Sequence, residues 1–391
     1  MSLPPGYAQL QGETYPSNSV CRLRKSLYGL KQASRQWNQK LTLVLLNAAY
    51  THCKSDHSMF VKRRGTSIVV ILIYVDDILV TGNDVTLFSE LKEVLQAEFQ
   101  IKDLGEMKYF LGIEVARSQM GIQICQRKYT LEMLEEFGLL GCKPAASPME
   151  AKLKLSQDAG ELLADPTSYR KLIGKLIYLS VTRPDISFPV TKLSQYMAQP
   201  RDTHFQAALR VLKYLKNAPG QGLYYSSQND LSLTAYSDAD WGACPDSRKS
   251  VTGFCVFLGN SLVSWKSKKQ STVSRSSAES EYRALAQTTC ELLWISSLLS
   301  DIQVPLLNPI TLFCDSKSAI HIATNPVYHE RTKHIEMDCH FVRDKVKSGF
   351  LQLSHVSSSE QIADLLTKPL YIDHFHRLLI KMGIRNLYSP S

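Results

Sequence analysis

Two adjacent carboxylates, Asp76 and Asp77, lie between two strongly apolar segments, residues 68–73 and 78–80. The β-branched residues on both sides favour strands, and the polar pair between them marks the turn of a β-hairpin. Burying one unpaired carboxylate is expensive, and two neighbouring carboxylates repel each other. A divalent cation bound at the tip would remove that cost, and so would exposure in a surface turn. We interpret the pair as a metal-binding tip, with the surface turn as the alternative.

Up to residue 230 the chain alternates between helical patterns and short strands. Helices are expected at residues 22–47, 84–99 (with Asp84 as N-cap), 128–138, 167–181, 185–198 and 202–217, and strands at 108–116 and 121–126. Residues 141–166 have the proline and serine content of a linker.

From Leu231 onward the pattern changes to β-β-β-α-β-α-α-β-α. Strands are expected at residues 232–238, 251–258, 261–266, 310–314 and 351–355, and a long helix at 277–299. Ser357 or Ser358 would cap a last helix containing Asp364, with Glu360 completing a capping box. The whole pattern predicts a multidomain chain of the α/β and α+β classes, for which 391 residues suffice.

Four acidic residues of this last part lie at the ends of separate elements: Asp238, Glu279, Asp315 and Asp364. Singly, each would be read as a cap or a surface residue. Together they can hold two Mg²⁺ or Mn²⁺ ions for phosphodiester cleavage, because such ions prefer oxygen ligands. His355 precedes Asp364 on a strand end and could relay protons. Asp240 and Glu281 are rivals of Asp238 and Glu279 that the pattern leaves open.

Basic residues suggest contacts with nucleic acid. The net charge is +9, and residues 151–230 carry 11 basic against 6 acidic side chains. Arg210 and Lys213 share one helix face, for which a solvated surface is the alternative. Arg275 and Ser276 precede the long helix, where a phosphate could meet its N-terminus. Arg331, Lys333 and His334 form a candidate backbone-binding ridge.

Several other classes of protein and site are disfavoured. The spacing of His329, His334, Cys339 and His340 matches no zinc-ligand pattern. The nine cysteines form no CxxC pair, which points to a reducing compartment. Neither a signal peptide nor an apolar membrane span is visible. We therefore expect an intracellular protein, in the cytoplasm or nucleus, of unknown oligomeric state.

Seven segments together resemble the Pol polyprotein of copia-type LTR retrotransposons. Residues 26–37 are similar to its template-binding motif, 74–77 to its polymerase metal site and 102–112 to the approach to its primer grip. Its RNase H signature is matched by residues 236–242, 276–282, 314–317 and 361–368. The first match adds Lys31, Gln32 and Arg35 as candidate contacts to nucleic acid.

The resemblance implies a partial reverse-transcriptase palm, a helical thumb and connection, and an RNase H-like domain with a five-stranded mixed sheet flanked by helices. It sets expected boundaries for fingers and palm at 1–140, a linker at 141–166, thumb and connection at 167–230, RNase H at 231–370 and a tail at 371–391. It also implies RNA–DNA hybrids and template-primers as partners, and two Mg²⁺ ions in the RNase H site.

One departure from the family pattern affects the polymerase. In the family a further catalytic carboxylate lies upstream of the Pro-Pro-Gly that stands here at residues 4–6. We therefore expect Mg²⁺-dependent cleavage of the RNA strand of hybrids, with the polymerase inactive. The alternatives are a catalytically dead remnant that only binds nucleic acid, and a polymerase that survives because a partner chain supplies the absent strand.

Overall fold

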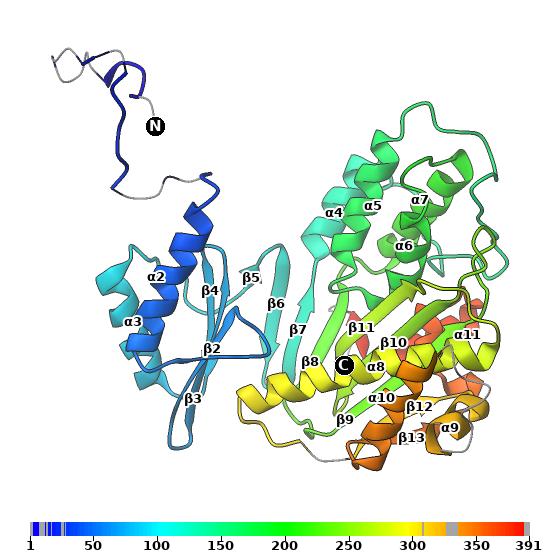
Figure 1. Cartoon of the computed structure of the whole chain (residues 1–391). Coiled ribbons are helices and arrows are strands. Elements are labelled where there is room, and N and C mark those ends of the chain that lie inside the picture. The colour runs from blue at the N-terminus through cyan, green and yellow to red at the C-terminus, as the bar shows by residue number, and fades with distance from the viewer. Residues whose placement is uncertain are drawn as a thin grey trace. The chain divides into compact units, whose positions relative to one another are not determined.

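The computed structural model describes residues 3–7, 12, 15–16, 18–24, 27, 29–306, 309–325 and 335–386 (Figure 1). The chain forms two compact units. The first comprises Met1–Asp103 with Ser297–Val304, and the second comprises Leu104–Ser296 with Pro305–Ser391. The division at residue 103 differs from the expected boundary at 140, and the expected linker, 141–166, lies inside the second unit.

The first unit contains a four-stranded antiparallel sheet. Its strands in spatial order are β1 (Thr51–His52), β2 (Met59–Arg64), β3 (Ser67–Tyr74) and β4 (Asp77–Gly82). Helices α2 (Ala33–Asn47) and α3 (Val85–Glu98) share one core with the face of β3 that carries Val69, Ile71 and Ile73. Asp84 caps α3 as predicted, because its carboxylate accepts the backbone N–H groups of Thr86 and Leu87.

The opposite face of the same sheet is also covered. Ile68, Val70 and Leu72 pack in a second cluster with Leu298 and Ile302, which belong to the 297–304 segment. A strand buried on both faces needs apolar residues at successive positions. This explains the unbroken apolar run before Asp76.

Helix α2 is shorter than predicted. It begins at Ala33, and the described residues between 22 and 32 are not helical. Gly29 has a φ of +85°, in the left-handed region, which ends a right-handed helix. The helical periodicity over residues 22–32 was therefore misleading.

The second unit contains two five-stranded sheets. The first has the spatial order β14 (Ile384–Asn386), β8 (Gln221–Ser226), β7 (Gly121–Cys125), β6 (Ile113–Ser118) and β5 (Tyr109–Phe110), all antiparallel. Thus residues 167–230, expected to be helical, also contribute a strand, and so does the expected tail.

Four helices near this sheet confirm the helical patterns. They are α4 (Arg127–Glu136), α5 (Thr167–Leu179), α6 (Ser187–Ser194, preceded by the 3₁₀ turn η1, Pro184–Ile186) and α7 (Asp202–Asn217). Their apolar faces meet in one large core, which also takes in β8 and β10 of the second unit.

The second sheet of this unit is the predicted five-stranded mixed sheet. Its order is β11 (Ser261–Lys269), β10 (Val251–Leu258), β9 (Leu233–Asp240), β12 (Ile310–Cys314) and β13 (Leu351–His355). The pairs β11–β10 and β10–β9 are antiparallel, whereas β9–β12 and β12–β13 are parallel. Residues 259–260 form the hairpin turn between β10 and β11.

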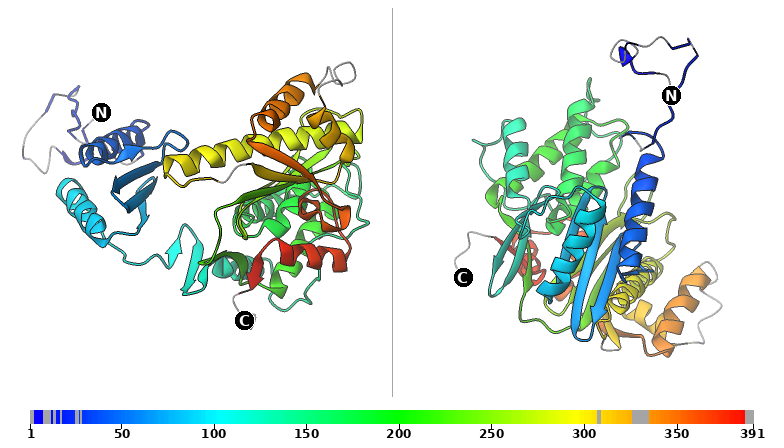
Figure 2. Two further views of the ribbon diagram at one scale, coloured as in Figure 1. Left: turned by 90° about the horizontal axis from the view of Figure 1, so that it is seen from below. Right: turned by 90° about the vertical axis from the view of Figure 1, so that its left-hand side faces the viewer.

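Helices cover both faces of this sheet (Figure 2). Helix α8 (Ser277–Asp301) lies on one face, where Gln270 donates hydrogen bonds to Thr252 of β10 and to the Ser280 carbonyl. The 3₁₀ turn η4 (Ile362–Leu366) and helix α11 (Ile372–Lys381) lie on the other. A Cβ at Gly253 would come within 2.6 Å of Thr367, so this glycine lets η4 approach the sheet.

Helices α9 (Lys317–Thr324) and α10 (Glu336–Lys347) are confirmed between β12 and β13. The segment after β13 differs from the expectation in two ways. The expected last helix is a pair of 3₁₀ turns, η3 (Ser358–Glu360) and η4, and Gln361 rather than a serine caps η4. No helix among the described residues combines the length and apolarity needed to cross a bilayer.

A buried ion pair stabilises the helical part of the second unit. The Arg183 guanidinium donates to both Asp185 carboxylate oxygens, at 3.0 and 2.7 Å, and the Tyr214 hydroxyl donates to the same carboxylate at 2.6 Å. The two charged side chains are 1% and 0% exposed. The remaining guanidinium nitrogen donates to the Ala218 carbonyl, so the network is well satisfied.

We expect the substitution Asp185→Asn to lower the free energy of unfolding by about 3–5 kcal/mol, because it leaves a buried guanidinium without its counter-charge. The control is Glu150→Gln, which breaks the partly exposed Arg210–Glu150 pair and should cost no more than about 1 kcal/mol. Urea denaturation of both variants measures the difference. Equal losses would show that burial of the pair is unimportant.

Candidate active site

The parallel strands bring two of the predicted carboxylates to one edge of the mixed sheet. In the parallel register Phe313 of β12 lies beside Tyr236 of β9, so Asp315 and Asp238 follow at the same end of the two strands. Asp238 is 1% exposed, and Asp315 is half-buried. His355 closes β13 beside Cys314 and is exposed. The carboxyl ends of parallel strands meet at one edge, which is a common place for a site.

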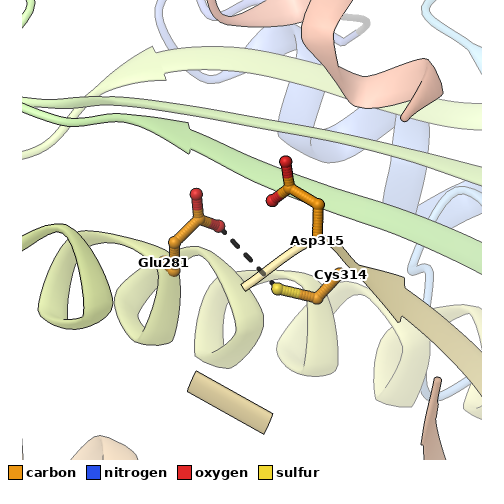
Figure 3. Close-up of side chains that lie close together, drawn as sticks. All are labelled: Glu281, Cys314 and Asp315. Carbon is orange, nitrogen blue, oxygen red and sulfur yellow. Dashed lines mark hydrogen bonds between the residues drawn. The ribbon is translucent and has the colours of Figure 1, made fainter. Parts of the chain in front are cut away.

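Helix α8 brings Glu281, the rival named from the sequence, to this edge, whereas Glu279 lies on another side of the helix. The Glu281 carboxylate faces Asp315, and one of its oxygens lies 3.9 Å from the Cys314 sulfur (Figure 3). Glu279 instead accepts the backbone N–H of Arg275 and pairs with Arg283 at 3.0 Å. Residues two apart on an α-helix point in directions about 200° apart, so the two acids cannot both face the site.

Turn η4 supplies the fourth carboxylate, Asp364. Gln361 anchors this turn by donating to the Ser237 carbonyl on β9, at 3.0 Å. Asp364 is 4% exposed, and the Lys368 ammonium lies 2.9 Å from its Oδ1 and 3.5 Å from Asp238 Oδ2. The Thr367 hydroxyl also donates to Asp238.

Asp240 is a neighbour of the site. It lies two residues after Asp238 on the same face of β9, and burial raises its pKa. The hydrogen bonds and ion pairs just described involve Asp238. Of these two residues, Asp238 is therefore the one that contacts Thr367, just after η4, and Lys368 directly, and the choice of Asp238 stays a prediction.

The cluster is short of positive charge. Burial, followed by repulsion from Asp238 and Asp315, raises the pKa of Glu281 to about 9. Burial and the Asp238 charge raise the pKa of Asp364 to about 7. Buried like charges shift pKa values in this direction, and a bound cation would shift them back.

The donor atoms favour a hard cation. Glu281, Cys314 and Asp315 form the one group, within the described part of the chain, whose three potential ligand atoms lie within 4.8 Å of one another. Burial and the nearby Glu281 charge raise the pKa of the Cys314 thiol, so it stays protonated and is a poor ligand. The remaining donors are carboxylate oxygens, which suit Mg²⁺ or Mn²⁺ rather than zinc.

The hairpin tip of the first unit is a second acidic feature. Tyr74 pairs with Asp77, and Val75 between them has a φ of +53°, a conformation that costs a β-branched residue about 1–3 kcal/mol. The Trp37 indole donates to the Val75 carbonyl at 2.8 Å and holds this turn. Asp76 and Asp77 are both exposed, as a metal-binding tip and a surface turn would each require.

The predicted contacts to nucleic acid are dispersed. Lys31, Gln32 and Arg35 are exposed at the start of α2, and Arg275 and Ser276 are exposed just before α8. On α7, Arg210 is paired with Glu150 and Lys213 is half-buried. Arg331, Lys333 and His334 lie outside the described residues.

One residue of the site, Lys368, was missed in the sequence, whereas Glu281 was named there as a rival of Glu279. Lys368 follows Asp364 by four positions, a spacing that signals an ion pair on a helical segment. Glu281 shares its stripe with Ala278 and Leu285, three and four positions away. That stripe faces the sheet, so the periodicity did contain the correct register.

The raised pKa values predict how pH affects stability in the absence of divalent cations. An unfolded chain ionises Glu281 and Asp364 near pH 4–5, whereas the folded chain keeps their protons up to about pH 9 and 7. The free energy of unfolding should therefore fall as pH rises from about 5 to 9, by at most about 1.4 kcal/mol per pH unit for each proton.

Urea denaturation across this pH range measures the slope. Glu281→Gln should flatten it, because the amide does not titrate, and the exposed Glu150→Gln should not. A Glu281→Gln slope equal to that of the wild type would contradict the buried, protonated carboxyl.

Comparison with known proteins finds both a family model and sequence relatives. Residues 1–151 match the family model for reverse transcriptase (RNA-dependent DNA polymerase). The chain is 46% identical to the retrovirus-related Pol polyprotein from transposon RE2 of Arabidopsis thaliana, over 98% of the chain and 26% of the relative. It is 34% identical to the corresponding polyprotein from transposon TNT 1-94 of Nicotiana tabacum, over 94% of the chain and 28% of the relative. The chain thus spans about a quarter of these relatives.

A shorter relative is matched almost completely. The putative transposon Ty5-1 protein of Saccharomyces cerevisiae is 31% identical over 74% of this chain and 94% of the relative. Among solved structures, the N-terminal RNase H domain of rv2228c from Mycobacterium tuberculosis is 12% identical, with a TM-score of 0.27, over 39% of this chain and 98% of that one. LC11-RNase H1 in complex with an RNA/DNA hybrid is 13% identical, with a TM-score of 0.27, over 35% of this chain and 94% of that one.

The relatives matched over 98% and 94% of the chain cover both units, including the acidic edge of the mixed sheet and the hairpin at Asp76. The chain belongs to the copia-type Pol polyproteins of retrotransposons.

Proposed function

We propose that the second unit hydrolyses the RNA strand of RNA–DNA hybrids in an Mg²⁺-dependent reaction. The observation that carries this proposal is the convergence of four carboxylates from β9, α8, the end of β12 and η4: Asp238, Glu281, Asp315 and Asp364. No common structural role explains four acids in one half-buried place, since each raises the cost of burying the others.

The chemistry of the donor set fits a pair of Mg²⁺ or Mn²⁺ ions. Asp238 interacts electrostatically with both Glu281 and Asp364, so it is the residue suited to be shared between two ions. When bound, such ions supply an activated water and stabilise the charge on the leaving oxygen. The four carboxylates would hold them, and the bound cations would offset the mutual repulsion that raises the pKa values of Glu281 and Asp364.

Neighbouring side chains position the acids. The Ser358 hydroxyl donates to Asp315 Oδ2 at 2.8 Å, and Thr367 fixes Asp238. His355 is exposed at the same sheet edge, where its imidazole can serve as a general acid or base. At the start of α8, exposed Arg275 can bind a phosphate of the substrate backbone.

Family membership supports the choice of substrate. Its model describes RNA-dependent DNA polymerases, and the product of such an enzyme is an RNA–DNA hybrid. A nuclease in the same chain would act on that product. The alternative, a remnant that binds hybrids without cleaving them, predicts salt-sensitive binding and no turnover.

The decisive variants are a matched pair on one helix. Glu281→Gln should lower the rate of Mg²⁺-dependent hybrid cleavage by at least about 100-fold. Mutation of a residue that only hydrogen-bonds to a metal ligand can already lower activity by up to about 100-fold, and Glu281 would be a ligand itself. Glu279→Gln should keep a rate of wild-type order, because Glu279 bonds to Arg275 and Arg283.

A labelled hybrid, with single-stranded RNA as control, provides the assay. Asp315→Asn should behave like Glu281→Gln. Cleavage that needs Glu279 but not Glu281 would refute the geometry, and hybrid binding without any cleavage by the wild type would favour the remnant.

We further propose that this 391-residue chain alone does not polymerise DNA. Two-metal polymerisation needs ligands to both ions, and Asp76 and Asp77 belong to no group of three convergent ligands within the described residues. Purified protein should therefore fail to extend a primer on an RNA template in Mg²⁺ or Mn²⁺. Extension that disappears in Asp76→Asn would overturn this proposal.

A further inference from the structure

A basic side chain lies inside the acidic cluster. The Lys368 ammonium is 2.9 Å from Asp364 Oδ1 and 3.5 Å from Asp238 Oδ2, and the side chains of both aspartates are buried. Among the described residues, Lys368 is the one base that the structure pairs with a carboxylate of the cluster. It therefore neutralises one half of the site, formed by Asp238 and Asp364.

The other half has a different environment. Glu281 and Asp315 face each other next to the protonated thiol of Cys314. Of the groups that shift the pKa of Glu281 most, Lys368 has the smallest effect. The four acids thus form a half that is open to a cation and a half that already contains one.

We propose that Lys368 is a displaceable internal counterion, which stabilises the metal-free fold and competes with a divalent cation for the Asp238–Asp364 half of the site. This inference rests on the proposed function, because it concerns the same carboxylates. A divalent cation and the ammonium cannot share these oxygens without strong repulsion. Binding of the cation therefore requires the lysine to swing out.

Lys368 is able to move in this way. Its side chain is 32% exposed, whereas its partners are buried, so a path to solvent exists. It lies two residues beyond the end of η4, and lysine is a single charge on a flexible four-carbon stem. Asp238 also keeps the hydrogen bond from Thr367 when the lysine leaves.

The test compares Lys368→Met with Lys381→Met in the full chain without nucleic acid. Lys381 is a matched control, since it pairs with Glu360 and is 38% exposed. Calorimetric titration with MnCl₂ and MgCl₂ gives the affinity for the metal alone, and thermal unfolding in EDTA gives the stability of the metal-free protein.

We expect Lys368→Met to lower the metal Kd by about tenfold, the change that about 1.4 kcal/mol produces, and to lower the metal-free Tm. Lys381→Met should leave the Kd unchanged. Lys368→Arg retains the charge and gives a second reading that does not depend on how Lys368→Met folds. It should bind metal no more tightly than the wild type.

A purely structural ion pair would give a different result. Lys368→Met would then lower the Tm with and without metal equally, and the Kd would not change, which would overturn the inference. Tighter metal binding by Lys368→Arg would overturn it too. If no variant binds either metal, the inference fails together with the proposed function. Hybrid cleavage by the wild type with an unchanged Kd in Lys368→Met would refute the inference alone.

Discussion

The parallel pairing of β9 with β12, and of β12 with β13, is the constraint on which the acidic site depends. It aligns the ends of three strands, so that Asp238, Asp315 and His355 emerge at one edge. Antiparallel strands would have placed successive ends at opposite edges. Helix α8 and turn η4 then need only contribute one acid each, from opposite faces of the sheet.

This arrangement works against stability. The pair Arg183–Asp185 shows how the same unit buries charge at low cost, with opposite signs and hydrogen bonds on every side. Glu281 and Asp364 are buried among like charges, and Lys368 offsets only part of the repulsion. Buried carboxylates with strongly raised pKa values are common at functional sites, and this excess of negative charge is what the proposed cations would offset.

Much of the fold was predictable from local pattern. The hairpin at Asp76, the cap at Asp84 and the strands β9 to β13 follow from alternation and turn residues, which are local properties. The errors have physical causes as well. Residues 22–32 are periodic but contain Gly29 at positive φ, and β8 and β14 gain their partners from distant segments. Glu279 and Glu281 are both acidic and both largely buried. Only the rotation of α8 about its own axis, which packing sets, decides which of the two faces the sheet edge.

Helix α8 has a consequence for how this chain can be divided. Its first turns carry Glu281, and its last residues supply Leu298 to the core of the first unit, where Asp301 accepts the backbone N–H groups of Lys54 and Ser55. A fragment cut before Ser297 would expose one face of the β2–β3 sheet, and a fragment that keeps the whole helix would carry its apolar end into water. Separating the two units into independent chains would therefore require a new covering for that face.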